Sequence, residues 1–421
     1  MAHIGFLCPP IAGHLNASAT LARTLASRGH RASAFQLPEA RATIEAQQLE
    51  FVPLGHGGSD TRAVSEAVAR LGSLEGLSAL RFSVQCCASL ARTMCEHGPA
   101  AIGRSDVDLL VVDQNEPAGA TVAERLEIPF VSVASGLPLN REPAVPPPFV
   151  PWAHSRRLST RLLNTATYAV FDRLVAPVNR VLNTYRRQWR LPPIRTPDDT
   201  FSDLAQISQL TEDFDFPRAS KPPSLHYVGP LRDDRRPTVP FAYEQLNGKP
   251  IVYASLGTLQ NRRPEVFRAI ASACERLDVQ LVISTGGAPL ALSGLPGAPI
   301  VVRYAPQWEL LDRAAACVTH GGLNTVMEAL SCGVPLVVLP VTNDQPAVAA
   351  RVRSAGAGEV IANTRVSTER VLAALRRVLG DPSCRQHAQR LKASIVRAGG
   401  AARAADIVEA VLARRPRPIR T

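Results

Sequence analysis

The sequence predicts an α/β protein made of two doubly wound domains, each a parallel sheet flanked by helices, that face each other across a cleft. Three observations favour this fold. The 421 residues are too many for one compact domain. Short apolar runs alternate with helical patterns in both halves of the chain, as in parallel βαβ units. Between the two series lies a stretch rich in proline and charge, 229–240, which is typical of a linker.

In the first half of the chain, the pattern of apolar residues predicts alternating strands and helices, interrupted by a proline-rich segment. Leu137–Trp152 contains six prolines, and proline lacks the backbone donor that a central strand or a helix interior needs, so we expect an irregular loop there. The predicted strands are His3–Cys8, Ala32–Gln36, Phe51–Leu54, Leu109–Asp113 and Phe130–Ala134, and the predicted helices are His14–Arg28, Thr61–His97, Ala118–Leu126 and Ser155–Trp189.

The second half repeats the alternation, which gives four expected parts. These are a domain over 1–228, a linker over 229–246, a domain over 247–395, and a C-terminal helix with a basic tail over 396–421. The predicted strands here are Ile251–Ser255, Gln280–Ser284, Ile300–Arg303, Cys317–Thr319, Leu336–Leu339 and Glu359–Ile361, and the predicted helices are Glu265–Arg276, Gln307–Arg313, Asn324–Ser331, Gln345–Ser354 and Ser367–Leu379.

Composition and charge exclude several classes of protein. With 46% hydrophobic and 20% charged residues the chain is globular rather than disordered. No apolar stretch is long enough to span a bilayer, and the first residues lack the features of a signal peptide, so we expect a cytoplasmic protein. The net charge is +11, but 44 of 47 basic residues are scattered arginines without an interleaved aromatic platform. This argues against nucleic-acid binding and favours at most a loose, peripheral attraction to an anionic membrane.

The eight cysteines include no C-x-x-C pair, and Cys8, Cys317 and Cys332 lie within apolar runs. We therefore expect buried, reduced thiols rather than a disulfide framework or a zinc site.

The strongest functional pattern lies in the second half. A predicted strand ends just before a Gly321-Gly322 turn, which lets the backbone approach a ligand, and a helix with free N–H groups opens at Asn324. This arrangement favours an anion site suited to a pyrophosphate. In the alternative interpretation, Asn324 or Thr325 caps the helix and His320 has only a structural role. This interpretation fits each residue alone, but it does not explain why all of them occur together in this order. The set is Ala305, Gln307, His320, Gly322, Asn324, Thr325, Glu328, Asp344 and Gln345.

Two further features belong to the same domain. Glu328 lies one turn after Asn324 on the same helix face, where it can accept from ribose hydroxyls, and Asp344 with Gln345 can hold sugar hydroxyls. The loop Ser255-Leu256-Gly257-Thr258 follows the first strand and is a second candidate phosphate loop, with a simple turn as its alternative.

The first domain carries a candidate catalytic pair. His14 follows the first strand, and Asp113 ends another predicted parallel strand, so both lie at the carboxyl edge of the sheet. Such a carboxylate can hold the tautomer and the developing charge of a histidine base. The alternative is that His14 is a cap or a surface group. Because no G-x-S-x-G nucleophile motif accompanies the pair, the group deprotonated is expected to be a substrate hydroxyl.

Two D-x-D pairs could suggest a metal. Asp106-Val107-Asp108 precedes its strand and lies at the wrong end of the sheet, and Asp213-Phe214-Asp215 lies in a loop between prolines. We therefore expect no metal and no other cofactor, with phosphate charge met by helix N-termini and side-chain donors.

These residues resemble the UDP-glycosyltransferase family. The second half is similar to the family's nucleotide-sugar signature, and the first half supplies its Gly13-His14 and Asp113, so the resemblance spans nearly the whole chain and implies the GT-B fold. Within the family, four strings are similar to the bacterial zeaxanthin glucosyltransferases. They are residues 112–119, 138–143, 205–210 and 254–260.

The resemblance implies roles for the site residues. His14 would be the general base and Asp113 its partner, so that a deprotonated acceptor hydroxyl attacks the anomeric carbon of UDP-glucose with inversion. The second domain would hold the donor: Tyr304 and Gln307 the base, Glu328 the ribose, His320, Asn324, Thr325 and Thr258 the pyrophosphate, and Asp344 and Gln345 the sugar. Ser255, Gly257, Ala305 and Gly322 of the same domain and Gly13 of the first domain would complete the site.

The acceptor pocket is expected in the first domain, at Asn115, Phe149 and Trp152, whose surroundings suit a hydrophobic acceptor. A carotenoid diol such as zeaxanthin is favoured, and a phenolic, flavonoid or macrolide alcohol is the rival. Tyr304 stands where plant members carry Trp, a change also found in bacterial members that use dTDP sugars, so the donor base stays open. A nucleotide-sugar epimerase and a non-catalytic accessory protein are the remaining alternatives.

Overall fold

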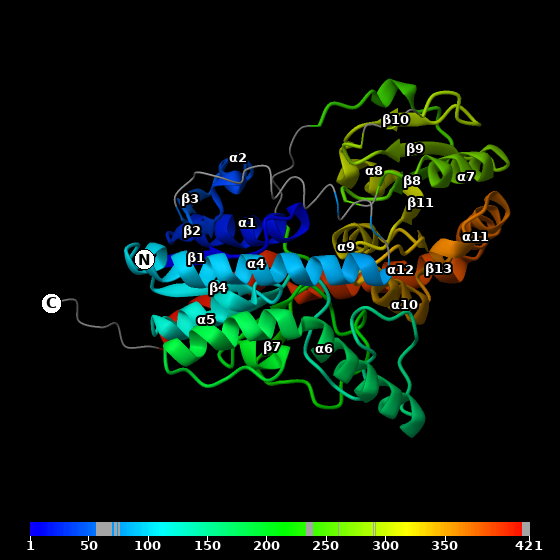
Figure 1. The fold of residues 1–421 in the computed structure, drawn as a ribbon. Coiled ribbons are helices and arrows are strands. Elements are labelled where there is room, and N and C mark those ends of the chain that lie inside the picture. The colour runs from blue at the N-terminus through cyan, green and yellow to red at the C-terminus, as the bar shows by residue number, and fades with distance from the viewer. Residues whose placement is uncertain are drawn as a thin grey trace.

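The computed structural model describes residues 1–55, 70, 74, 76–232, 239–259, 261–288, 290 and 292–414. It contains two parallel sheets in separate lobes, one for each half of the chain, and so confirms the predicted fold class (Figure 1). Part of the predicted helix Thr61–His97, the middle of the predicted linker and the end of the predicted basic tail lie outside the described residues.

The first sheet has the strand order β3-β2-β1-β4-β5-β6-β7, with every neighbouring pair parallel. Its central strands are fully buried on both faces, as the apolar runs of the sequence predict. The strands are β1 His3–Leu7, β2 Arg31–Gln36, β3 Glu50–Pro53, β4 Leu109–Asp113, β5 Phe130–Ala134, β6 Gln206–Ser208 and β7 Leu225–Tyr227, and the helices are α1 Ala12–Ser27, α2 Arg41–Ala46, α4 Gly76–Gly103, α5 Pro117–Arg125 and α6 Leu158–Gln188.

The second sheet has the order β10-β9-β8-β11-β12-β13 and is also parallel throughout. Two apolar clusters cover its two faces. Its strands are β8 Ile251–Ser255, β9 Gln280–Ser284, β10 Ile300–Val302, β11 Ala314–Thr319, β12 Leu336–Val338 and β13 Gly358–Val360, and the helices are α7 Pro264–Glu275, α8 Gln307–Arg313, α9 Leu323–Ser331, α10 Gln345–Ser354, α11 Thr368–Gly380, α12 Pro382–Ala398 and α13 Gly400–Ala413.

Several expected elements need correction. The sequence analysis did not predict α2, β6, β7 or α12, because a six-residue helix and three-residue strands are too short to show a period and the pattern of α12 is mostly polar. Leu137–Trp152 has neither helix nor strand, as predicted. All eight cysteines are free; six are buried, whereas Cys86 and Cys87 are only half-buried.

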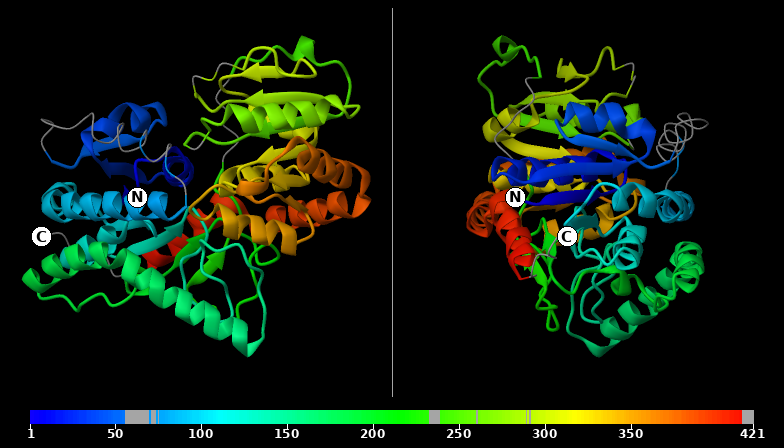
Figure 2. Two further views of the ribbon diagram at one scale, coloured as in Figure 1. Left: turned by 45° about the vertical axis from the view of Figure 1, so that its right-hand side comes forward. Right: turned by 90° about the vertical axis from the view of Figure 1, so that its left-hand side faces the viewer.

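The C-terminal helix returns to the first domain. Helix α13 packs on α1, and its Ala404, Ala405 and Val408 belong to the same apolar cluster as Ile4 and Leu21 (Figure 2). The first lobe is thus completed by residues from the other end of the chain. No helix in the part of the chain that the structure describes is long and apolar enough to cross a membrane.

A buried ionic cluster joins the two domains. Arg351 of α10 lies 2.8 Å from Asp215 of the first domain, and both side chains are almost fully buried. Asp215 also accepts from Arg218 at 3.0 Å and from the Tyr227 hydroxyl at 2.6 Å, while Arg351 lies over the Phe216 ring. The two guanidinium groups keep the pKa of Asp215 below its usual range, although its burial acts in the opposite direction.

Candidate active site

The candidate base and its carboxylate partner meet above the first sheet. Strands β1 and β4 are neighbours, so the helix that follows β1 and the last residue of β4 lie at the same edge. His14 is in the first turn of α1, which begins at Ala12, two residues earlier than predicted. Its Nδ1 lies 2.9 Å from Asp113 Oδ2, and the backbone N–H of Asn115 donates to Asp113 Oδ1 at 2.8 Å. Asp113 therefore orients the imidazole and leaves Nε2 for other partners.

The two groups shift each other's pKa. Burial lowers the pKa of His14, but the charge of Asp113, the hydrogen bond to it and the charge of Asp344 outweigh burial, so the pKa lies above its usual value. Burial raises the pKa of Asp113, and His14 more than offsets that effect, so the pKa is lowered. Both shifts favour a protonated imidazole beside an ionised carboxylate, the state reached after a histidine base takes a proton.

His320 follows β11 and is packed between two glycines. A Cβ atom added to Gly257 or to Gly322 would lie 2.6 Å from the imidazole ring, so neither position has room for a side chain. Gly257 and Gly321 also have φ values of +75° and +88°, which favour glycine. Burial lowers the pKa of His320 to about 4, so the ring is neutral near pH 7 and can donate only one N–H.

Asn324 does not cap α9. The N-cap position is Gly322, so the interpretation of Asn324 or Thr325 as a helix cap is wrong. Instead Asn324 Nδ2 donates to the carbonyl oxygen of Gly13 at 3.0 Å, and its Oδ1 accepts from Gln209 at 3.3 Å. This side chain therefore links the start of α9 to the backbone beside His14.

Gln307 and Glu328 form a hydrogen-bonded pair on α8 and α9. Gln307 Nε2 donates to Glu328 Oε2 at 2.5 Å, and Gln307 Oε1 accepts from the buried Tyr253 hydroxyl at 2.9 Å. Burial raises the pKa of Glu328, against the opposing effects of Gln307 and Arg232. Tyr304 is exposed, its hydroxyl end lies beside Gly287, and the Arg303 guanidinium lies over its ring, 5.9 Å from the centroid.

Asp344 lies close to the first domain. A Cβ atom added to Gly136 would be 3.3 Å from Asp344 Oδ2, and burial raises the pKa of Asp344 while His14 lowers it. The Oε1 atom of Gln345 accepts from the backbone N–H groups of Val341 and Thr342, at 2.8 and 3.0 Å. Its carbonyl oxygen is thus engaged in holding the loop.

The remaining predicted residues fall into two groups. Ser255 and Thr258 flank the Gly257 turn after β8, where Ser255 is buried and Thr258 is exposed. Of the predicted acceptor residues, Asn115 lies beside Asp113, whereas the other two contact α6. Phe149 stacks on Phe171 with ring centroids 4.7 Å apart, and Trp152 Nε1 donates to Asn164 at 3.0 Å. The structure does not bring Phe149 or Trp152 into contact with His14.

The two D-x-D pairs have other partners. Asp108 accepts from the backbone N–H of His3 at 2.7 Å, before β4 begins, and Asp215 is held in the interdomain cluster. Among the residues that the structure describes, no three histidine, cysteine or acidic side chains gather in a way that could hold a metal ion.

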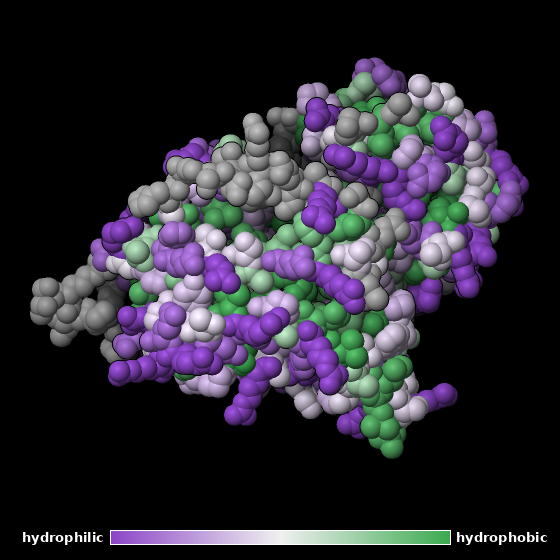
Figure 3. Space-filling model, in the orientation of Figure 1, coloured by the Kyte–Doolittle hydropathy of each residue, from purple (hydrophilic) through white to green (hydrophobic). Residues whose placement is uncertain are grey.

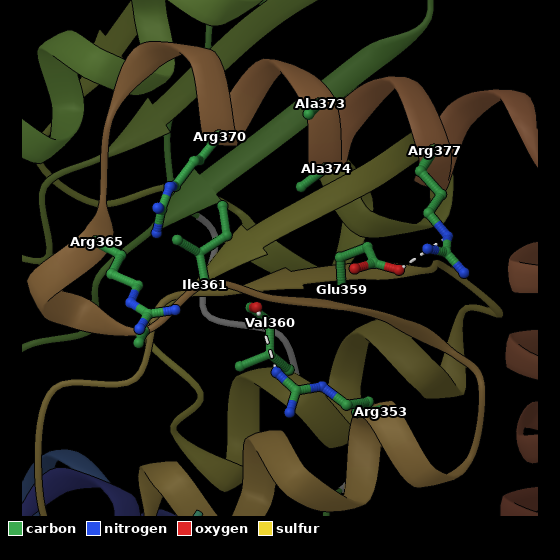
Figure 4. Close-up of a pocket in the computed structure, with 10 residues that line it drawn as sticks. Arg353, Glu359, Val360, Ile361, Arg365, Arg370, Ala373, Ala374 and Arg377 are labelled. Carbon is green, nitrogen blue, oxygen red and sulfur yellow. Dashed lines mark hydrogen bonds and ion pairs between the residues drawn. The ribbon is translucent and has the colours of Figure 1, made fainter.

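A hollow of about 400 Å³ opens along the edge strand β13 (Figure 4). Arg377 pairs with Glu359 at 3.0 Å, and Arg353 donates to the carbonyl oxygen of Val360 at 3.3 Å. Since no predicted site residue lines this hollow, we do not include it in the candidate site. Its lining is Arg353, Glu359, Val360, Ile361, Ala362, Arg365, Arg370, Ala373, Ala374 and Arg377.

Two residues of the site were not singled out from the sequence. Gln209 donates to the carbonyl oxygen of Ser135 and to Asn324, and accepts from the backbone of Leu231, so it supports the interdomain contact. Tyr253 holds Gln307. Gln209 follows the short strand β6, and Tyr253 lies within a buried strand, so no sequence pattern distinguishes either residue. The only signal for Gln209 was the similarity of residues 205–210 to the zeaxanthin glucosyltransferases.

Two facing parallel α/β domains, with a His–Asp pair on one and a glycine turn with helix α9 on the other, define a glycosyltransferase of the GT-B fold. The family model described as "UDP-glucoronosyl and UDP-glucosyl transferase" matches residues 23–397. The chain belongs to this family.

Full-length relatives agree with this assignment. The chain is 35% identical to the zeaxanthin glucosyltransferase of Pantoea ananas, over 98% of this chain and 96% of that protein. It is also 35% identical to the zeaxanthin glucosyltransferase of Pseudescherichia vulneris, over 98% of each. Among solved structures, the calicheamicin glycosyltransferase CalG4 has a TM-score of 0.74 at 25% identity and covers 98% of this chain and 99% of its own.

Proposed function

We propose that this glycosyltransferase moves glucose from UDP-glucose to a hydroxyl of a hydrophobic acceptor, with a carotenoid diol such as zeaxanthin as the favoured acceptor. The observation that carries the transfer chemistry is the 2.9 Å contact between His14 and Asp113. Asp344 of the second domain lies next to Gly136 of the first domain. The names of the full-length relatives support the carotenoid.

In the proposed mechanism, His14 Nε2 takes the proton of the acceptor hydroxyl, and Asp113 stabilises the imidazolium through Nδ1. The hydroxyl oxygen forms a bond to the anomeric carbon as the bond from that carbon to the phosphate oxygen breaks. UDP leaves on the opposite side, so the configuration inverts. Positioning of the two substrates supplies most of the acceleration, and the base contributes on the order of 10²–10⁴-fold.

The donor is proposed to lie along α8, α9 and α10. Gln307 and the exposed Tyr304 ring suit the nucleotide base, Glu328 the ribose, and Asp344 the sugar. The pyrophosphate charge is met by the N–H groups at the start of α9, by Thr325 and Thr258, and by the neutral His320. Because these groups are donors and a helix end, we propose transfer without a metal ion.

We also propose that the protein is cytoplasmic and makes peripheral contact with a membrane, where a carotenoid diol would reside. The acceptor is proposed to enter from the first domain, past Asn115 and the segment 137–152.

The test is mass spectrometry of products after incubation with UDP-glucose or dTDP-glucose and one acceptor at a time: zeaxanthin in detergent, a flavonol, or a macrolide. We expect one or two hexoses on zeaxanthin with UDP-glucose, and a β-linkage by NMR. Transfer only to the flavonol or the macrolide would keep the mechanism and overturn the carotenoid. A new sugar formed from donor alone would indicate an epimerase.

His14→Ala tests the base. We expect kcat to fall on the order of 10²–10⁴-fold while the Kd for UDP stays unchanged, because His14 is assigned to the acceptor. His226→Ala, a half-buried histidine on β7, is the matched control and should keep full activity. Normal transfer by His14→Ala would rule out the proposed mechanism.

A further inference from the structure

The first turns of α6 carry an apolar face that points into solvent. Leu158, Leu162, Leu163 and Val170 are 69%, 63%, 51% and 53% exposed. The start of α6 projects from the body of the protein in Figure 1, and the same tip is green in the space-filling view (Figure 3). Leucines are unusual as the tip of a projecting helix, since most large apolar side chains gain stability from burial.

The exposed residues share one side of the helix. Leu158, Leu162 and Ala166 are four residues apart, and Ala169 and Val170 continue the same side. The opposite side of the helix packs on the first domain. Asn164 is fully buried there and donates to the carbonyl oxygen of Pro143 at 2.9 Å, and Tyr168, one turn further along, is also buried. The first half of α6 is therefore held to the first domain along one side, while its apolar side is not covered by the described residues.

Basic residues accompany the apolar face. Arg156, Arg157 and Arg161 are all exposed, and no acidic residue occurs between Glu142 and Asp172. The segment thus combines exposed leucines with an excess of positive charge. This combination fits an anionic phospholipid bilayer, in which negatively charged headgroups cover an apolar layer of acyl chains. A protein partner with an apolar groove would not require the uninterrupted positive charge.

The patch is connected to the candidate site by a fixed segment. The chain runs from Gly136, beside Asp344, through 137–157 to the start of α6. Near the end of this segment, Trp152 Nε1 donates to the buried Asn164 of α6 at 3.0 Å. This hydrogen bond links the segment to the buried side of α6. Tryptophan side chains are favoured at the level of lipid headgroups. A bilayer under the tip of α6 would thus lie against the same segment that borders the site.

We propose that the exposed start of α6, formed by Leu158, Leu162, Leu163 and Val170 with Arg156, Arg157 and Arg161, docks the enzyme on an anionic phospholipid bilayer. The leucines enter the headgroup region while the arginines bind lipid phosphates. The proposal rests on the proposed function only in explaining how a hydrophobic acceptor reaches the enzyme. Binding to lipid is measured without any substrate, so the docking surface and the proposed glucosyl transfer can each fail while the other stands.

The test is co-sedimentation of the purified protein with vesicles of phosphatidylcholine alone or with 30% phosphatidylglycerol, at low and high salt. We expect binding to the anionic vesicles that weakens with salt. Leu158→Gln/Leu162→Gln should lower the partition coefficient tenfold or more on anionic vesicles. Arg157→Gln/Arg161→Gln should lower it by a similar factor at low salt, with little change on neutral vesicles.

Matched controls separate this patch from general hydrophobicity and charge. Val396→Gln removes an exposed apolar side chain from α12, and Arg365→Gln/Arg370→Gln removes two charges from the hollow beside β13; both should bind vesicles as the wild type does. All variants should keep the wild-type melting temperature and the wild-type rate on a water-soluble acceptor. Absence of vesicle binding by the wild type, or equal loss in the controls, would overturn the proposal. So would a dimer that Leu158→Gln/Leu162→Gln splits, because the patch would then join two copies of the chain.

Discussion

The side-chain amide of Asn324 donates a hydrogen bond to the carbonyl oxygen of Gly13 at 3.0 Å, across the boundary between the two domains. Gly13 precedes the candidate base His14, and Asn324 lies in the first turn of α9 after the Gly321-Gly322 turn. This hydrogen bond therefore contributes to the distance between the residues proposed to activate the acceptor and those proposed to hold the donor phosphates. In-line displacement requires that distance to be fixed.

The pH dependence of transfer should depend on the His14–Asp113 pair. The base must be neutral, and the pKa of His14 is raised, so kcat/KM should increase with pH along an acid limb centred above 6.5. Asp113→Asn removes the charge that favours the imidazolium, so the limb should move to lower pH. The variant should also lose on the order of 10²-fold or more in kcat, because the amide does not stabilise the charged ring.

The measurement is kcat/KM between pH 5 and 9 with a water-soluble acceptor, alongside binding of UDP by calorimetry. UDP affinity should be unchanged in Asp113→Asn, because the carboxylate contacts His14 and the backbone of Asn115. An acid limb that stays in place in the variant would show that His14 does not set the profile.

Gly322→Ala should disturb the donor site through His320. The backbone at Gly322 has φ near −60°, which alanine adopts freely, so the effect comes only from the added Cβ, 2.6 Å from His320 Nε2. The ring must move, at a cost of about 1–3 kcal/mol in stability, and we expect the Kd for UDP to increase about tenfold or more. In a His320→Ala background the methyl group has room, so His320→Ala/Gly322→Ala should bind UDP as His320→Ala does. An additive loss in the double variant would contradict this explanation.

Local pattern was sufficient to predict much of the fold. The bounds of β4 and β5 were predicted to the residue, since each is a short apolar run between turns. In contrast, β6 has only three residues, and the return of α13 to α1 is a contact between the two ends of the chain. Neither feature produces a hydrophobic periodicity in the sequence, because the strand is too short and the helix contact depends on long-range packing.

The candidate site shows the same division. Spacing along single elements was enough to bring His14 near Asp113, since neighbouring parallel strands end at one edge. Contacts between domains were not predictable: Asn324 was expected to bind phosphate, and its bonds to Gly13 and Gln209 depend on how two separate domains pack. The roles of the residues toward substrates stay predictions that the experiments above test.

Arg351→Met should destabilise the protein by about 3–5 kcal/mol. The side chain is almost fully buried 2.8 Å from Asp215, and its removal leaves that carboxylate with less compensating charge. Urea unfolding at pH 7 measures the loss. Asp215→Asn/Arg351→Met removes the uncompensated charge, so it should lose less than the sum of the two single variants. If the losses add, the two groups do not interact as the structure shows.

Glu116 should make the protein less stable as pH rises. Its carboxyl group is buried at the start of α5, where Oε1 has no hydrogen-bond partner, and burial together with the charge of Asp113 raises its pKa from 4.5 to about 8. Between these two values the folded protein holds a proton that the unfolded chain has lost. Folding then takes up a proton, so the free energy of unfolding decreases as pH increases from about 4.5 to 8 and levels off above.

Glu116→Gln has no proton to lose and should escape this decrease. The variant should match the wild type near pH 4 and exceed its free energy of unfolding by on the order of 2–4 kcal/mol at pH 8. Urea unfolding curves at half-unit pH steps give the difference, with the exposed Glu244→Gln as control. The control should follow the wild type at every pH. A constant difference between Glu116→Gln and the wild type would mean that amide packing, not proton uptake by the carboxyl group, determines the effect.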